Sequence, residues 1–133
     1  MRKLLFMALA SLALTIASCN NAEQAKPEEM VGRVAKTYYD YLIEGKYEAF
    51  VDGFYRPDSI PGSYREQLIA NAKMYMGQLD DDHKGLASVQ IAGAKADTAR
   101  HAGHAFLLLC FEDSTKEEVV VPMVLNKGNW MMR

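Results

Sequence analysis

The sequence lacks the features that define several large classes of protein. Its 133 residues include only two cysteines, so a disulfide-rich scaffold is excluded. Basic residues do not outnumber acidic ones, and a net charge of −2 is unlike that of a nucleic-acid-binding protein. Half of the residues are hydrophobic, which excludes a disordered chain. The length allows one domain and excludes a two-domain enzyme.

Signatures of catalysis and of metal binding are also scarce. The chain has no glycine-rich phosphate loop, and neither Ser63 nor Ser88 lies in the Gly-x-Ser-x-Gly context of a nucleophile elbow. His101 and His104 are three residues apart, which in a regular strand places them on opposite faces. A zinc site needs three or four ligands. We therefore expect no metal, no cofactor and no catalytic residue.

The first eighteen residues have the layout of a signal peptide. Two basic residues precede an apolar run at 4–16, which is too short to span a bilayer as a mature helix. The tetrapeptide Ile-Ala-Ser-Cys at 16–19 then resembles the lipobox of bacterial lipoproteins. The resemblance implies cleavage after residues 1–18 and lipidation of Cys19 by a diacylglyceryl group and a further acyl chain such as palmitate. An ordinary secretory signal with an incidental cysteine is the alternative.

Lipidation of Cys19 predicts a domain held at a membrane by its N-terminus, because two or more acyl chains anchor stably. Loss of residues 1–18 removes two basic and no acidic residues, which leaves 13 basic against 17 acidic residues and a net charge of −4. Residues 19–27 are polar and are expected to form a flexible tether for a domain at 28–133. We expect a cell-envelope location, periplasmic or surface-facing. The outer membrane is favoured because Asn20 is not an acidic retention-like residue.

The spacing of apolar residues predicts three helices in the first half of the domain. The first begins near Pro27, ends at Gly45 and is followed by a short second helix around 47–54. Ser63 and Glu66 have the spacing of a capping box, so a third helix should begin there. The apolar face of the first helix is expected to be Val31, Val34, Ala35, Tyr38 and Leu42. That of the third is expected to be Leu68, Ala72, Tyr75, Met76 and Leu79.

The second half of the domain has the periodicity of strands. Val89 and Ile91 alternate with polar or small residues, 105–111 is a continuous apolar run, and 119–125 is β-branched and apolar. The second of these segments suits a central strand and contains Cys110, which we expect to be a buried, unreactive thiol.

Two polar segments are predicted to connect these strands. Residues 112–118 suit a hairpin connection, and Lys127-Gly128-Asn129 suits a turn before a short last strand that holds Trp130. Helices followed by an antiparallel sheet of about four strands indicate the α+β class.

The order of these features resembles that of a known family. The segments Gly-Lys-Tyr-Glu-Ala-Phe at 45–50 and Val-Leu-Asn-Lys-Gly-Asn-Trp at 124–130, together with the lipobox, look like the small cystatin-like or NTF2-like lipoproteins of the DUF4878 type. The resemblance covers 28–133 and implies a cone in which three N-terminal helices pack on a curved antiparallel sheet. Lys127 and Met131 depart from the family's usual ending, which bears on the subfamily rather than on the fold. Relatives with this fold include isomerase-like and cyclase-like enzymes as well as binding domains, so fold does not decide function.

Aromatic side chains are the candidate ligand contacts. Tyr38 and Tyr41 lie on the first helix, Tyr75 on the third and Trp130 on the last strand, and each belongs either to the core or to a cavity wall. In isomerase-like relatives a tyrosine and an acid act together, and Asp40 is the candidate acid here. Adjacent helical residues diverge by about 100°, so Asp40 cannot share a face with both neighbouring tyrosines.

The leading hypothesis is therefore a lipid-anchored, non-catalytic protein of the cell envelope. It would bind a small apolar ligand or a protein partner in the cavity between the first helix and the sheet. One alternative is a small isomerase-type or cyclase-type enzyme that uses a Tyr/Asp pair. Another is a homodimer formed across the exposed face of the sheet. The membrane, through Cys19, is an expected partner, and nucleic acid is not.

Overall fold

The computed structural model describes residues 25–133, so the predicted signal peptide, Cys19 and most of the tether lie outside the described residues. The elements are α1 (Pro27–Ile43), α2 (Tyr47–Asp52), α3 (Gly62–His83), β1 (Leu86–Asp97), the 3-10 turn η1 (Thr98–Arg100), β2 (Ala102–Phe111), β3 (Lys116–Asn126) and β4 (Asn129–Met132). The strands form one antiparallel sheet in the order β1-β2-β3-β4. The α+β class and the four-stranded sheet are thus confirmed, and helix α1 takes in the last residue assigned to the tether.

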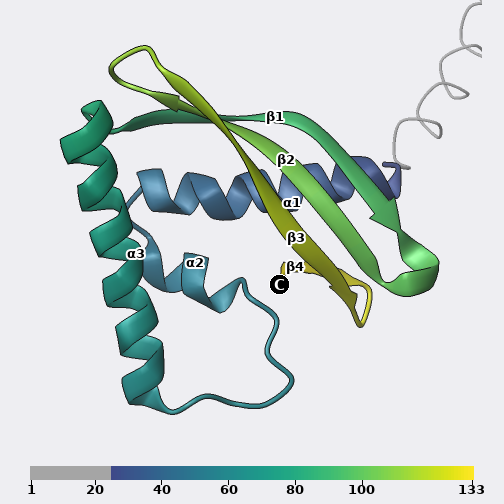
Figure 1. Cartoon of the computed structure of the whole chain (residues 1–133). Coiled ribbons are helices and arrows are strands. Elements are labelled where there is room, and N and C mark those ends of the chain that lie inside the picture. The colour runs from purple at the N-terminus through teal and green to yellow at the C-terminus, as the bar shows by residue number, and fades with distance from the viewer. Residues whose placement is uncertain (1–24) are drawn as a thin grey trace, which may run out of the picture.

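The sheet curves over α1, which lies along its concave face, whereas α3 stands crosswise at one end of the molecule (Figure 1). Helix α2 packs against both α1 and α3. The segment that follows α2 runs beside β4. The amide of Tyr55 donates to the carbonyl of Met132 at 2.7 Å, and the amide of Met132 donates to the carbonyl of Gly53 at 2.9 Å. These bonds fix the position of α2 against the last strand.

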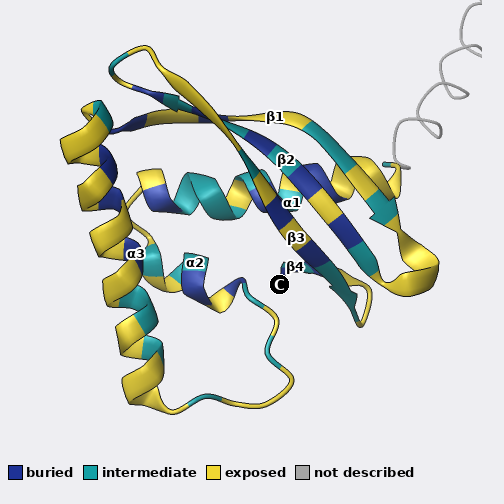
Figure 2. Cartoon of the chain, in the orientation of Figure 1, coloured by how far each residue is buried: buried dark blue, intermediate teal, exposed yellow. Residues whose placement is uncertain are grey.

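Among the described residues, the core lies between α1 and the inner face of the sheet, and its buried side chains run from Val31 to Met132. Side chains alternate along β2, so that Ala105, Leu107, Leu109 and Phe111 are buried against the helices. Helix α3 is largely exposed and buries one side of its C-terminal half (Figure 2). The predicted face of this helix is buried at Ala72, Met76 and Leu79. No helix in the described part of the chain is long and apolar enough to cross a membrane.

The predicted capping box of α3 is wrong. The helix begins at Gly62 after the extended residue Pro61, and no side chain caps its N-terminus. Ser63 is consequently already inside the first turn, where its hydroxyl cannot take the place of a cap. The proline sets the start of this helix because its ring fixes the backbone just outside it.

Two expectations about the sheet are also corrected. Strand β3 begins at Lys116, earlier than the predicted 119, because Lys116 pairs with Cys110 and extends the hairpin. The connection is therefore only 112–115. Cys110 is half-buried rather than buried, since the alternation along β2 places it on the outer, convex face of the sheet.

Candidate functional site

Helix α1 contributes neighbouring tyrosines to two different cavities. Tyr38 and Tyr41 lie toward β4, with ring centroids 5.8 Å apart in an edge-on contact. Tyr39 lies toward α2 and α3, where its ring meets that of Phe50 at 5.6 Å. The rotation of about 100° between successive helical residues accounts for this division.

The first cavity, the sheet-edge cavity, lies between α1 and β4 and has a volume of about 510 Å³. It is lined by Met30, Val34, Thr37, Tyr38, Tyr41, Gly128, Asn129, Trp130 and Met131. Three of the four predicted ligand contacts, Tyr38, Tyr41 and Trp130, are therefore together here.

Two of these aromatic rings are held tightly by glycines. Trp130 is only 8% exposed, and a Cβ atom on Gly103 would lie 3.2 Å from its ring. A Cβ atom on Gly53 would clash with the ring of Tyr38. Both rings are thus packed as core, and they form a fixed wall of the sheet-edge cavity.

The structure does not bring Asp40 into this cavity. Its carboxylate accepts a hydrogen bond from the ammonium of Lys36 at 2.7 Å, in a half-exposed ion pair one helical turn away. Asp40 is absent from the residues that line the cavity of Tyr38 and Tyr41. The Tyr/Asp pair of an isomerase-type site is consequently not assembled.

The second cavity, the helix cavity, lies between α1, α2 and α3 and has a volume of about 350 Å³. It is lined by Tyr39, Phe50, Val51, Phe54, Arg56, Leu68, Asn71, Ala72 and Tyr75. Tyr75 therefore lies apart from the other three predicted contacts. The rings of Tyr39, Phe50 and Phe54 follow one another edge-on, with the last two centroids 5.4 Å apart. This wall suits an apolar or aromatic ligand.

The tyrosine hydroxyls of the helix cavity are kept protonated by their surroundings. Burial, with a smaller effect of nearby Tyr75, raises the pKa of Tyr39 to about 12. Burial also raises the pKa of Tyr75, with a smaller effect of the Glu117 carboxylate. Within the described residues, no fully buried polar side-chain atom lacks a partner, and the hydroxyl of Tyr39 makes no hydrogen bond. That hydroxyl is therefore not fully enclosed by protein atoms.

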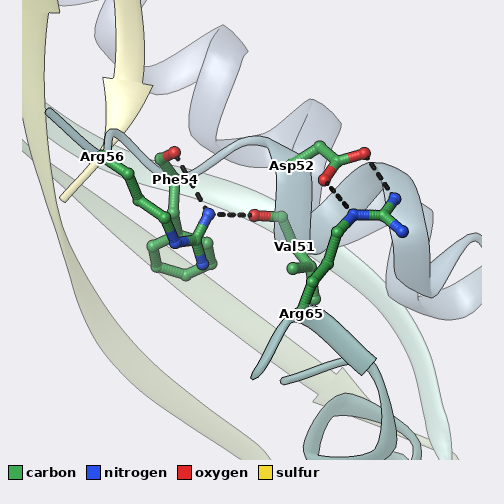
Figure 3. A network of polar contacts seen from close by, with 5 residues as sticks. All are labelled: Val51, Asp52, Phe54, Arg56 and Arg65. Carbon is green, nitrogen blue, oxygen red and sulfur yellow. Dashed lines mark hydrogen bonds and ion pairs between the residues drawn. The ribbon is translucent and has the colours of Figure 1, made fainter. Parts of the chain in front are cut away.

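Among the described residues, Arg56 is the one charged side chain that lines the helix cavity. Its Nη1 donates to the carbonyl of Val51 at 3.0 Å and to that of Phe54 at 3.5 Å (Figure 3). The nearby Asp52 instead accepts two hydrogen bonds of 2.9 Å from Arg65. This bidentate contact holds the pKa of the Asp52 carboxyl below its usual range.

Comparison with known proteins identifies the architecture. No protein-family model matches the sequence, and no curated protein matches it. Among solved structures, the chain is similar to a Campylobacter jejuni protein that carries the name NTF2-like transpeptidase, with a TM-score of 0.61 and 10% identity. The match covers 75% of this chain and 94% of that one. The fold is NTF2-like. At this identity the likeness concerns the fold alone, and it confirms the NTF2-like expectation for the domain.

In this NTF2-like fold, the two histidines considered from sequence do not lie together. His101 follows η1 and is exposed, and His104 is exposed on the outer face of β2. His83 instead contacts Asp113 at 3.1 Å. Among residues 25–133, no three histidine, cysteine or acidic side chains are grouped so that they could hold a metal ion.

Sequence reasoning missed most of the helix cavity. The four-residue spacing of Phe50 and Phe54 places both on one helical face, but spacing alone does not distinguish a cavity wall from core. Tyr39 lay outside the predicted apolar stripe of α1 and gave no signal of its own. Arg56 could not have been found, because its position depends on the irregular segment after α2.

Proposed function

We propose that this protein is a lipid-anchored, non-catalytic binding protein of the cell envelope, which takes a small apolar ligand in the helix cavity of its NTF2-like domain. The observation that carries the proposal is the aromatic wall of that cavity, together with a Tyr39 hydroxyl that has no partner in the described chain. Ligand sites typically combine an apolar lining with a few polar groups that fix orientation. The lining of the helix cavity has this composition.

The helix cavity is a better candidate than the sheet-edge cavity. In the sheet-edge cavity, Tyr38 and Trp130 already pack against backbone at Gly53 and Gly103. In the helix cavity, Tyr75 is 38% exposed and its hydroxyl is free to turn. A ligand there would cover exposed aromatic surface, and burial of such surface favours binding.

Bound ligand is best sought in material made by the native host. Native mass spectrometry of residues 20–133, exported to the envelope and purified gently, is expected to show a discrete added mass. The same preparation of Ala72→Leu should lose that mass, because the larger side chain occupies the helix cavity. Ala70→Leu, at an exposed position on the same helix, is the matched control and should retain it. A bare chain in the unmodified protein contradicts the proposal.

The lipid anchor has its own test. Metabolic labelling of the full chain with an alkynyl palmitate should give a labelled protein in the membrane fraction. Cys19→Ala should abolish the labelling, whereas Cys110→Ala should leave it unchanged. Equal labelling of the unmodified chain and of Cys19→Ala would exclude lipidation at this position.

The transpeptidase activity named for the Campylobacter protein is not part of the proposal. Covalent acyl transfer requires an activated nucleophile. In residues 25–133 the single cysteine, Cys110, lies on the convex face of the sheet, away from both cavities, and its Sγ is 3.9 Å from the carbonyl of Leu108.

A second candidate function is supported by the outer face of the sheet. Phe106 pairs with Val120 across β2 and β3, and Leu108 lies on the same face. Val120 is 54% exposed, so this apolar surface is open to water. We propose a second copy of the chain as its partner. Val120→Lys should then convert a dimer to a monomer in sedimentation, whereas Met74→Lys, at an exposed apolar site on α3, should not. A monomer at high concentration for the unmodified domain would exclude the dimer.

A further inference from the structure

Arg56 lies at the border between the aromatic wall and the carbonyl end of α2. Its guanidinium carbon is 5.8 Å from the centroid of the Phe54 ring, and the side chain is half-buried. Its Nη1 donates hydrogen bonds to two backbone carbonyls at the end of α2. An arginine carries further N–H donors at Nε and Nη2. Within residues 25–133, neither of these nitrogens donates to another side chain or carbonyl.

The positive charge of Arg56 is not neutralised by an ion pair. Among the described residues, no carboxylate lies within 4.0 Å of its guanidinium. Asp52, four residues before Arg56, is engaged by two nitrogens of Arg65 at 2.9 Å (Figure 3). Arg56 and Arg65 thus both lie near the Asp52 carboxylate, and only Arg65 forms an ion pair with it. Arg56 keeps its charge and its donors beside the cavity.

We propose that the helix cavity binds an amphipathic carboxylate, with its apolar body against Tyr39, Phe50 and Phe54 and its head group on Arg56. This inference rests on the proposed function and adds the chemical class of the ligand. A guanidinium and a carboxylate form charge-assisted hydrogen bonds, frequently two in parallel, and these are stronger than neutral ones. Partial burial strengthens them further, because the screening by water is reduced.

The composition of the cavity also selects the charge of the head group. Within the part of the chain that the structure describes, Arg56 is the only cationic residue that lines the helix cavity. Asn71 and the tyrosine hydroxyls add neutral donors. One cation with neutral donors matches a head group with one negative charge, whereas a phosphate monoester is recognised by clustered arginines or lysines. The apolar remainder of the wall excludes a small hydrophilic acid as the best ligand.

The test is a calorimetric titration of residues 20–133 with octanoate and with 1-octanol, which share an apolar chain and differ in the head group. This segment is the predicted mature chain without the lipidated Cys19, and it contains every core residue that the structure describes. We expect octanoate to bind about tenfold more tightly than 1-octanol, since a hydrogen bond to a charged group contributes about that much. Arg56→Gln should remove the preference by weakening octanoate alone. Arg56→Lys should retain part of it, because the charge remains.

Arg100→Gln is the control for overall charge, since Arg100 is exposed at the far end of β1 and should leave the preference intact. Binding of 1-octanol to Arg56→Gln verifies that the variant is folded and its cavity intact. A preference that survives in Arg56→Gln, or no preference in the unmodified protein, overturns the inference and leaves the proposed function standing. Failure of both ligands to bind the unmodified protein overturns the proposed function itself.

Discussion

The sheet-edge cavity and the helix cavity both have aromatic walls, yet their side chains are held differently. In the sheet-edge cavity, the buried ring of Trp130 packs against Gly103, and the ring of Tyr38 packs against Gly53. In the helix cavity, Tyr39 keeps an unbonded hydroxyl and Arg56 keeps an unpaired charge. An aromatic lining alone therefore does not distinguish a ligand site from the edge of a core. The distinction lies in whether the polar atoms and ring faces already have partners.

The largest loss of stability is expected from truncation of Trp130 in the wall of the sheet-edge cavity. Trp130→Ala should lower the free energy of unfolding by about 3–5 kcal/mol, because it removes a buried ring and leaves a void between α1 and β2. Urea unfolding followed by circular dichroism measures this change. Tyr64→Ala, at an aromatic residue that is 51% exposed on α3, is the control and should change stability by less than about 0.5 kcal/mol. A loss below about 1 kcal/mol for Trp130→Ala would show that its ring belongs to an open site.

A smaller effect should follow from adding one methyl group beneath Tyr38. Gly53→Ala should destabilise the domain by about 1–3 kcal/mol, because its Cβ meets the Tyr38 ring and the ring must move. Gly77→Ala, in the middle of α3 with open space around it, should instead stabilise by about 0.5–1 kcal/mol. Thermal unfolding of both variants compares them directly.

The double variant Gly53→Ala with Tyr38→Ala isolates the cause of that loss. If the clash is responsible, the two substitutions are strongly non-additive, since the second removes the ring that the first displaces. Additive effects would mean that Gly53 is required for another reason, such as the backbone contacts of this segment with Met132.

The sequence was sufficient to predict the helices and strands, but not the cavities that form between them. Periodicity identified α1, the strand at 105–111 and the last turn, because each depends on local patterns of apolar residues and glycine. It did not place Tyr75 with Tyr39 or Arg56 with Phe54, since those contacts join α3 to α1 and the loop after α2 to the aromatic wall. Helix α3 begins at Gly62, next to the predicted Ser63, but the predicted side-chain cap is wrong for a related reason. The local Ser63 signal was overridden by Pro61.

The smallest expected effect concerns the protonation of the Tyr39 hydroxyl in the helix cavity. The pKa of Tyr39 is raised to about 12 from the unfolded value of about 10, so the folded protein holds this proton more tightly. The resulting stability is complete below about pH 10 and is lost as the pH rises toward about 12. An ultraviolet titration should therefore show a tyrosinate step near pH 12, which Tyr39→Phe removes and Tyr38→Phe retains. Tyr75, whose pKa is also raised, still ionises in both variants. At neutral pH, Tyr39→Phe should change stability by less than about 0.5 kcal/mol, because the lost hydroxyl has no protein partner in residues 25–133. A step near pH 12 that persists undiminished in Tyr39→Phe would contradict the assignment of that step to Tyr39. A large loss of stability at neutral pH would mean that this hydroxyl is part of the core. The contrast between the two cavities would then disappear.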